Sequence, residues 1–385
     1  MGSGPLKGVR VIEIAGIGPG PYAAMLLADL GADVLRIERK EGVAIMKQMG
    51  FDPTRDVSNR SRHAIALDLK QPAAVGLVLD LVERADALTE GFRPGVVERL
   101  GLGPEACLAR NPRLVYGRMT GWGQTGPLSR AAGHDINYIA LSGMLSTFVR
   151  AGELPVPPGN TVGDMGGGGL LLAFGLVCAI LEARTSGAGQ VIDAAMFEGA
   201  ASLGTSLFVT LAMGLYDPSR PGGNLSDTGA HFYEVYATAD GRHVAVGAIE
   251  PQFYAELLRG LGLEAASLPP QMERRSWPQM KQRLAAIFRS KTRAEWEAIF
   301  EGKDACVSPV LSPAEAAQHP HARARGSFLE PGGVLQAAPV PRFSRTPGAI
   351  AAPPAVAGAD GDAALSAWGI KADRVSALRA AGALL

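Results

Sequence analysis

The chain has 385 residues, of which 47% are hydrophobic and 19% charged, so it has enough apolar material for a large core and a length typical of two or three domains. Basic and acidic residues both number 37, and this zero net charge argues against a nucleic-acid partner. Three scattered cysteines and six histidines without an HxxxH or HExxH spacing predict neither a disulfide framework nor a metal site.

The first elements predict a parallel α/β domain. Residues 9–14 form a β-branched run, residues 21–30 have the apolar spacing of a helix, and residues 33–37 read as a second strand. Strand, helix and strand in this order make a βαβ unit, the usual opening of a parallel sheet. Three glycines follow the first strand: Gly16, Gly18 and Gly20.

These glycines, with Glu38 about 20 residues further on, approximate a dinucleotide-binding fingerprint. Their spacing is GxGxG rather than GxGxxG, however, and Pro19 and Pro21 remove two backbone donors that a pyrophosphate would need. We therefore expect a tight turn that packs the helix on the strand. Nicotinamide binding, or another ligand at the same switch point, remains as an alternative.

The α/β pattern continues for about 200 residues. It includes a helix at 72–85, strands at 87–89 and 114–118, and two apolar helices at 165–184 and 195–215. We assign residues 1–200 to the first part of a large α/β domain.

A membrane span is not expected. Residues 165–181 carry no charge, but this stretch of 17 residues includes five glycines, and a spanning helix needs about 20 mostly apolar residues. The first ten residues lack the charged and apolar pattern of a signal peptide. We expect a buried helix and a cytoplasmic protein.

The composition changes after residue 216. We expect a turn-rich linker at 201–230 and then a small α+β domain at 231–318. Two alternating segments at 232–237 and 243–249 flank Asp240-Gly241, a strong hairpin signal. Helices are expected at 252–261, 278–288 and 293–300. The segment 319–385 is rich in proline and alanine and closes with a helix at 372–381.

The stretch 121–169 is the candidate site. It contains the motifs GWGQTGP, GHDINY and GNTVGDMGGGG. Asp135 is expected to cap a helix that runs through Ile139, and Asp164 to stand just before a glycine-rich helix, with Asn160 four residues earlier. Each residue could be a cap alone. Two ionisable groups, His134 and Asp164, at helix starts among glycines that permit close approach favour a site.

These motifs identify a family resemblance. The segments PLKGVRVIEIAGIGPGPYAAMLLADLGADVLRIER, TEGFRPGVVERLGLG, TGWGQTGP, AGHDINYIALSG, VGDMGGGG and PRFSRTPG resemble family III CoA-transferases (CaiB/BaiF type), and within that family the α-methylacyl-CoA racemases. The histidine of GHDINY is the discriminating residue, because the transferases usually carry another residue there. The resemblance implies an interlocked homodimer of a large Rossmann-like parallel-sheet domain, completed by the return segment 319–385, and a smaller α+β domain.

The resemblance also implies roles for individual residues. His134 and Asp164 would be the two acid/base groups, and Glu250 would orient His134. Asn160 would stand beside Asp164, and the backbone at Asp135 would hold the thioester oxygen. Taken alone, Arg93 and Arg99 would be surface charges. The expected substrate- and CoA-binding set is Arg39, Leu67, Leu69, Lys70, Gly91, Arg93, Arg99, Gly133 and Tyr138.

The implied activity is interconversion of (R)- and (S)-2-methylacyl-CoA through an enolate, with CoA as part of the substrate and no cofactor or metal. The alternatives are a CoA-transferase in which Asp164 attacks the acyl-CoA, and an inactive acyl-CoA-binding module. The sequence departs from the usual racemase pattern at Met165, in the long segment 41–60 and at residues 359–361.

Overall fold

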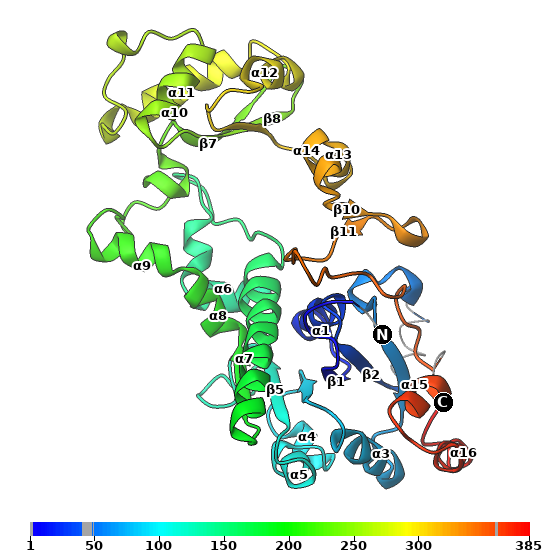
Figure 1. The fold of residues 1–385 in the computed structure, drawn as a ribbon. Coiled ribbons are helices and arrows are strands. Elements are labelled where there is room, and N and C mark those ends of the chain that lie inside the picture. Colours follow the sequence, from blue (N-terminus) through cyan, green and yellow to red (C-terminus); the bar gives the residue numbers. More distant parts are fainter. Residues whose placement is uncertain (1–2, 41–47, 49, 359–360) are drawn as a thin grey trace. The chain divides into compact units, whose positions relative to one another are not determined.

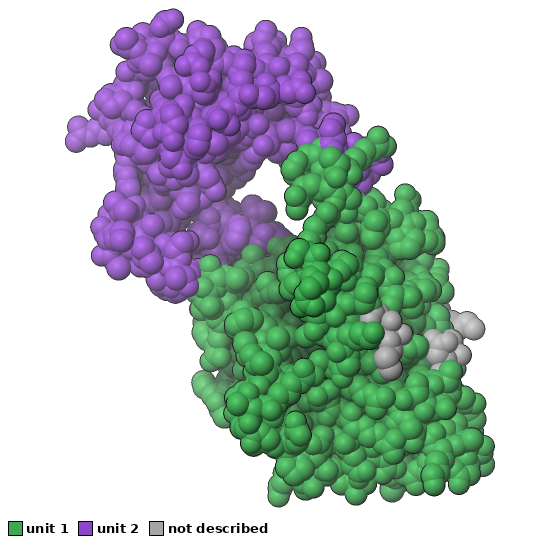
Figure 2. All heavy atoms as spheres, in the orientation of Figure 1, with its two compact units in different colours: residues 1–142, 159–203, 321–385 green, residues 143–158, 204–320 purple. Residues whose placement is uncertain are grey.

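The computed structural model describes residues 3–40, 48, 50–358 and 361–385, so the segment 41–60 and the turn 359–361 lie partly outside the described residues. The chain forms two compact units, coloured separately in Figure 2. Unit 1 comprises Met1–Ser142, Gly159–Leu203 and His321–Leu385. Unit 2 comprises Gly143–Pro158 and Gly204–Pro320.

Unit 1 is built on a six-stranded parallel sheet in the order β3-β2-β1-β4-β5-β6 (Figure 1). The strands are β1 (Arg10–Ile14), β2 (Asp33–Arg39), β3 (His63–Leu67), β4 (Ala87–Glu90), β5 (Val115–Thr120) and β6 (Val191–Ala195). The predicted α/β class and the four predicted strands are confirmed. The two outer strands, β3 and β6, were not predicted.

Helices cover both faces of this sheet. Alternate residues of β1 face opposite sides: Val11 belongs to the core under α1 (Pro19–Asp29) and α7 (Leu171–Ser186). Its neighbour Ile12 belongs to the second core, which contains α3 (Pro72–Val82). Burying a Val or Ile side chain contributes about 1.5–3 kcal/mol, so both faces stabilise the sheet. The second core also contains α5 (Pro104–Arg110), α15 (Gly361–Ala367) and α16 (Ala372–Ala380).

The apolar segment predicted as a buried helix forms one continuous helix. A π-helix, η4 (Thr161–Leu170), leads directly into α7. The combined helix Thr161–Ser186 is long and apolar enough to cross a membrane by length and composition, a test that core helices also pass. Its inner face packs on β5 through Leu172 and Leu176, whereas Phe174 and Leu181 on the other side are exposed.

The return segment completes unit 1. Residues beyond 321 form the hairpin β10 (Phe328–Leu329) and β11 (Gln336–Ala337) and then α15 and α16. The buried Arg60 guanidinium links α1 to the return segment. It donates to Oδ2 of Asp29, at the end of α1, at 2.5 Å and to Oε1 of Gln336, in β11, at 2.7 Å. Near the end of the chain, Leu384 forms a β-bridge with Leu67 of β3.

Unit 2 has a three-stranded antiparallel sheet with helices packed on it. Its strands are β7 (Tyr233–Ala237), β8 (His243–Gly247) and β9 (Val307–Pro309). The predicted hairpin and three helices are present as β7–β8, α10 (Pro251–Gly260), α11 (Trp277–Phe288) and α12 (Arg293–Phe300). The single helix expected at 195–215 is instead two helices, α8 (Met196–Leu203) and α9 (Thr205–Ala212), interrupted at Gly204. The expected linker 201–230 therefore contains α9 and the π-turn η5 (Leu225–Gly229).

The remaining elements are short. They are α4 (Val96–Arg99), α6 (Asp135–Leu141), α13 (Pro313–Gln318), α14 (Pro320–Arg325), η1 (Pro53–Arg55), η2 (Val57–Asn59), η3 (Met144–Thr147), η6 (Ala265–Ser267), η7 (Arg274–Ser276) and η8 (Pro331–Gly333).

Candidate active site

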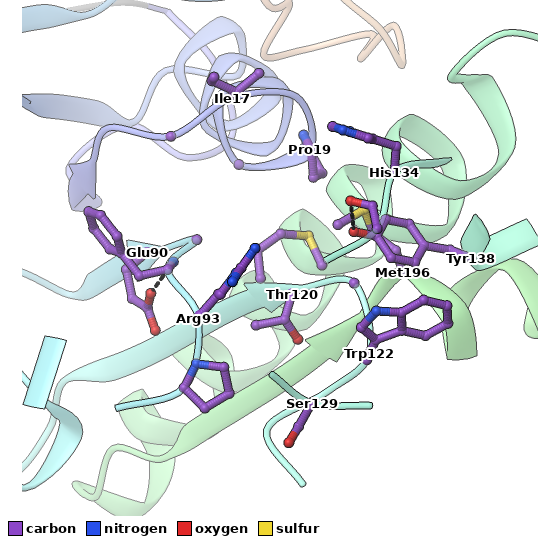
Figure 3. A pocket seen from close by; sticks show the side chains of 18 of the residues that line it. Ile17, Pro19, Glu90, Arg93, Thr120, Trp122, Ser129, His134, Tyr138 and Met196 are labelled. Atoms are coloured by element: carbon purple, nitrogen blue, oxygen red, sulfur yellow. Dashed lines mark hydrogen bonds between the residues drawn. The ribbon is translucent and has the colours of Figure 1, made fainter. Parts of the chain in front are cut away.

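A cavity of about 250 Å³ opens where the strand order of unit 1 reverses, between β1 and β4. In open α/β sheets, ligands bind outside the carboxyl ends of the strands at such a switch point. The walls are the turn after β1, the loops after β4 and β5, and the loop that leads into α6 (Figure 3). The topology of the sheet therefore places this cavity where a ligand is expected.

The turn after β1 is the expected tight turn. Gly18 has a φ of 75°, which glycine adopts readily, and Pro19 begins α1 immediately after it. A Cβ at Gly18 would lie 3.4 Å from Oδ2 of Asp164, so the turn and this carboxyl are close neighbours. Gly16, Ile17, Pro19 and Gly20 of the turn line the cavity.

His134 lies at the cavity wall, at the cap position directly before α6. It is exposed, and its ring points toward the Pro19 side of the cavity in Figure 3. The expectation that Asp135 caps this helix is wrong: His134 has the extended backbone of the cap position and Asp135 is the first helical residue. The His134 N–H donates to Oδ1 of Asn137 at 3.0 Å, which fixes the backbone that carries the imidazole.

Asp164 lies inside the first turn of η4 rather than before the helix, and Asn160 takes the cap position. The Asp164 N–H donates to Oδ1 of Asp135 at 2.7 Å. Burial, and next the charge of Asp135, raise the pKa of the Asp164 carboxyl, while a hydrogen bond from Asn160 and the charge of His134 oppose that rise. The structure thus brings His134, Asp135, Asn160 and Asp164 into one electrostatically coupled group.

The glycine run of η4 allows neighbouring backbones to approach closely. A Cβ on Gly199 of α8 would lie 1.8 Å from the carbonyl oxygen of Gly167. A Cβ on Gly169 would lie 2.6 Å from the carbonyl oxygen of Pro19 in α1. A larger residue at either position would clash with neighbouring backbone, so the glycines are what let η4, which carries Asp164, pack this closely on α8 and α1.

Tyr138 supports the loop that precedes His134. Its hydroxyl donates to the carbonyl oxygen of Gly133 at 2.5 Å, and its ring meets the Trp122 ring edge-on, with the centroids 4.8 Å apart. A Cβ at Gly133 would lie 2.7 Å from the Tyr138 ring, so the glycine is required there. Burial, followed by the charge of Asp164, raises the pKa of Tyr138.

The loop after β4 brings a cationic side chain, Arg93, to the cavity. Glu90 accepts hydrogen bonds from the Phe92 N–H at 2.7 Å and from Arg118 Nε at 2.9 Å, which holds the loop. Gly91 and Arg93 line the cavity, and Figure 3 shows the Arg93 side chain reaching into it. The Arg39 guanidinium lies over the Phe92 ring, 5.9 Å from its centroid.

Other expected binding residues lie away from the cavity lining. The side chains of Leu67 and Leu69 are buried in the hydrophobic core, so only their backbone atoms remain for a ligand. Lys70 and Arg99 are exposed in unit 1. Glu250 belongs to unit 2, where it is exposed at the cap position of α10.

Sequence reasoning did not single out Glu13 or Trp122, which also line the cavity. Trp122 lies within the GWGQTGP motif, and that motif was the available signal. Glu13 is buried in β1 and paired with Arg36 and Arg62. Burial alone would raise the pKa of Glu13, but the charges of Arg62 and Arg36 hold it below its ordinary value. Among the described residues, no group of three or more His, Cys, Asp or Glu could hold a metal ion.

Comparisons with known proteins show the family and the fold of this chain. The model of CoA-transferase family III matches residues 6–361. The chain is 50% identical to the alpha-methylacyl-CoA racemase of Mus musculus over 89% of its own length and 87% of the mouse protein. It is 46% identical to the alpha-methylacyl-CoA racemase of Homo sapiens over 89% of its own length and 90% of the human protein. The crystal structure of a CAIB/BAIF family protein from Brucella suis shares the fold, with a TM-score of 0.80 at 24% identity over 95% of this chain and all of that one.

Proposed function

Because this chain belongs to CoA-transferase family III, we propose that it interconverts the (R) and (S) forms of 2-methylacyl-CoA thioesters. The observation that carries the proposal is the pairing of His134 with Asp164 beside the switch-point cavity, linked through Asp135. Relatives that are 50% and 46% identical and are named alpha-methylacyl-CoA racemase support the choice of substrate.

The chemistry requires two acid/base groups on opposite faces of C2. One group removes the α-proton, the thioester becomes an enolate, and the other group returns a proton to the opposite face. We assign these roles to His134 and Asp164. The raised pKa of Asp164 suits this work, since general acid–base groups function best when their pKa lies near the working pH.

The enolate oxygen needs stabilisation because neither group is a strong base. The start of α6 presents backbone N–H groups beside His134, and one such donor can contribute about 3–4 kcal/mol to a developing oxyanion. We assign this role to the backbone at Asp135. Arg93 at the cavity, with Arg39 at the end of β2, would pair with the phosphates of CoA. Proton transfer of this kind draws on no redox group, so we propose that CoA enters only as part of the substrate.

We further propose that the protein works as an interlocked homodimer in which Glu250 of one chain orients His134 of the other. The family resemblance suggests this arrangement, and the exposed Phe174 and Leu181 on the outer side of α7 are apolar surface that a second chain would cover.

The test is incubation of each 2-methylacyl-CoA epimer with the protein in D₂O, followed by mass spectrometry and chiral analysis of the acyl group. We expect deuterium at C2 and loss of stereochemical purity without any acyl acceptor. If CoA instead passes to an added carboxylic acid, hydroxylamine traps an aspartyl thioester at Asp164, and no label enters C2, the protein is a transferase. Binding of acyl-CoA without either reaction would leave only a binding module.

A further inference from the structure

The Asp135 carboxyl joins the two elements that carry the acid/base pair. Asp135 is the first residue of α6 and its side chain is almost fully buried. Its Oδ1 accepts the Asp164 N–H at 2.7 Å, across 29 residues of sequence. A Cβ on Gly163 would lie only 2.7 Å from the same oxygen, so the first turn of η4 fits closely around this carboxyl.

The other oxygen of this carboxyl is unsatisfied. Oδ2 of Asp135 is buried and has no hydrogen-bond partner among the residues that the structure describes. A buried acceptor without a donor lowers the free energy of unfolding, because the hydrogen bonds that it made to water are not replaced in the folded protein. A residue present only to hold the two helices together could be an asparagine or a serine, so the negative charge itself needs an explanation.

The negative charge of Asp135 raises the pKa of the Asp164 carboxyl. Among the described residues, the groups that act on Asp164 are His134, Asp135 and Tyr138 at α6 and Asn160 at the cap of η4; the Tyr138 hydroxyl is neutral unless it loses its proton, and the charge of Asp164 raises its pKa further. The neighbouring α1 presents Gly18 and Pro19, which carry no charge, and the nearest acidic residue of α8, Glu198, is exposed. Asp135 is therefore the negative side chain that opposes ionisation of Asp164, while His134 favours it.

We propose that Asp135 is a positioning residue for Asp164, acting through both its hydrogen bond to the Asp164 backbone and its charge. The hydrogen bond fixes the distance between η4 and the start of α6, and hence between Asp164 and His134. The charge keeps a proton on Asp164 at a higher pH than the same site would without it. This role is separate from that of the Asp135 backbone and rests on the proposed racemase function.

Two substitutions separate the two actions. Asp135→Asn keeps an oxygen that can accept the Asp164 N–H and removes the charge, whereas Asp135→Ala removes both. Asp86→Asn is the matched control, because the Asp86 carboxyl also accepts a backbone N–H, from Arg10 at 2.8 Å, near the amino ends of the strands. Thermal unfolding of each variant establishes that the fold is retained.

The first readout is the pH profile of deuterium exchange at C2, measured for each epimer. In Asp135→Asn we expect the limb that reports Asp164 to move to lower pH, with the KM for acyl-CoA little changed. In Asp135→Ala we expect kcat to fall by about 100-fold, as for a reacting group displaced by about 1 Å. Profiles of Asp135→Asn that superimpose on those of the wild type and Asp86→Asn would overturn the proposal.

The second readout requires no activity. Titration of ¹³C-aspartate-labelled protein by NMR, with the Asp164 resonance identified through Asp164→Asn, gives the pKa of Asp164 directly. We expect a lower value in Asp135→Asn than in wild type, and an unchanged value would contradict the proposal. Failure of the racemase assignment appears differently, as absence of exchange in the wild-type protein.

Discussion

At the scale of single residues, the chemistry of each polar group at the cavity is set by its neighbours as well as by its own type. Asp164 is set apart from an ordinary surface carboxylate by its burial and by its negative neighbour, Asp135. The motifs GHDINY and VGDMGGGG singled out His134, Asp135 and Asp164 from sequence because each motif places ionisable residues at a helix start, and the structure brings these residues together. Glu13 could not be identified in this way, since its partners Arg36 and Arg62 come from strands and loops that only the folded sheet brings together.

Removing either acid/base group should slow racemisation strongly. His134→Ala and Asp164→Ala should each lower the rate by at least about 100-fold, the usual contribution of such a group. Each variant should still exchange the α-proton of one epimer, since the remaining base can remove and return a proton on its own face. Mass spectrometry in D₂O, begun separately from each epimer, checks both expectations. Equal partial losses with both epimers in both variants would show that the roles are misassigned.

His231 in unit 2 should make stability depend on pH. Burial, and next the charge of Lys281, lower the pKa of His231 to about 4 from 6.5, and Tyr254 bonds its Nε2 at 2.8 Å. Between these values the unfolded chain binds a proton that the folded chain does not, so stability falls as the pH drops from 6.5 to 4. Denaturant unfolding across this range should give a shallower dependence in His231→Gln. His243→Gln, at an exposed position of β8, is the control and should behave as wild type.

At the scale of elements, the pattern of hydrophobic residues predicted the central strands of the parallel sheet and missed its two edge strands. The strands β1, β2, β4 and β5 are rich in buried β-branched or large residues and were predicted. The edge strands β3 (HAIAL) and β6 (VIDAA) contain several alanines, whose β propensity is weak, and they depend on pairing with a neighbouring strand. The interruption at Gly204 was likewise missed, because the apolar pattern continues across it.

The crossing of η4 and α8 should tolerate no added methyl group. Gly199→Ala should lower the free energy of unfolding by about 1–3 kcal/mol, as overpacking does, since its Cβ would meet the Gly167 carbonyl oxygen. Gly175→Ala in α7 is the matched control: its Cβ would make only an ordinary contact, 3.5 Å from Ile192, and alanine favours the helix by about 0.5–1 kcal/mol. Chemical denaturation distinguishes the two, and a Gly199→Ala protein as stable as wild type would refute close packing at this crossing.

At the scale of the whole molecule, neither unit is a continuous piece of chain. Unit 1 takes three separate segments and unit 2 takes two. The changes in composition near residues 216 and 319 indicated a second unit, although the longer segment of unit 2 already begins at Gly204, before the first of these changes. They could not indicate that residues 143–158 belong to unit 2, because this assignment rests on contacts such as the ion pair of Arg150 with Glu234.

The proposed interlocked dimer makes a test by complementation possible. If Glu250 of one chain orients His134 of the other, a heterodimer of His134→Ala and Glu250→Ala chains contains one doubly altered site and one intact site. Two affinity tags allow this heterodimer to be purified after co-expression, and we expect it to regain racemase activity that neither homodimer has. If both residues of a site come from the same chain, every site carries one lesion, and a verified heterodimer stays inactive.

The late pairing of the return segment has a consequence for biosynthesis. The core between β3 and α3 includes Leu365, Trp368 and Leu378, and the edge of β3 is closed by Leu384. Ribosomes add about 5–20 residues per second, so about 15–60 seconds separate the synthesis of β3 from that of these residues. During that interval the nascent sheet exposes an apolar face and an unpaired strand edge. The same architecture that completes the domain from its far end therefore leaves the growing chain with exposed apolar surface until the last helices emerge.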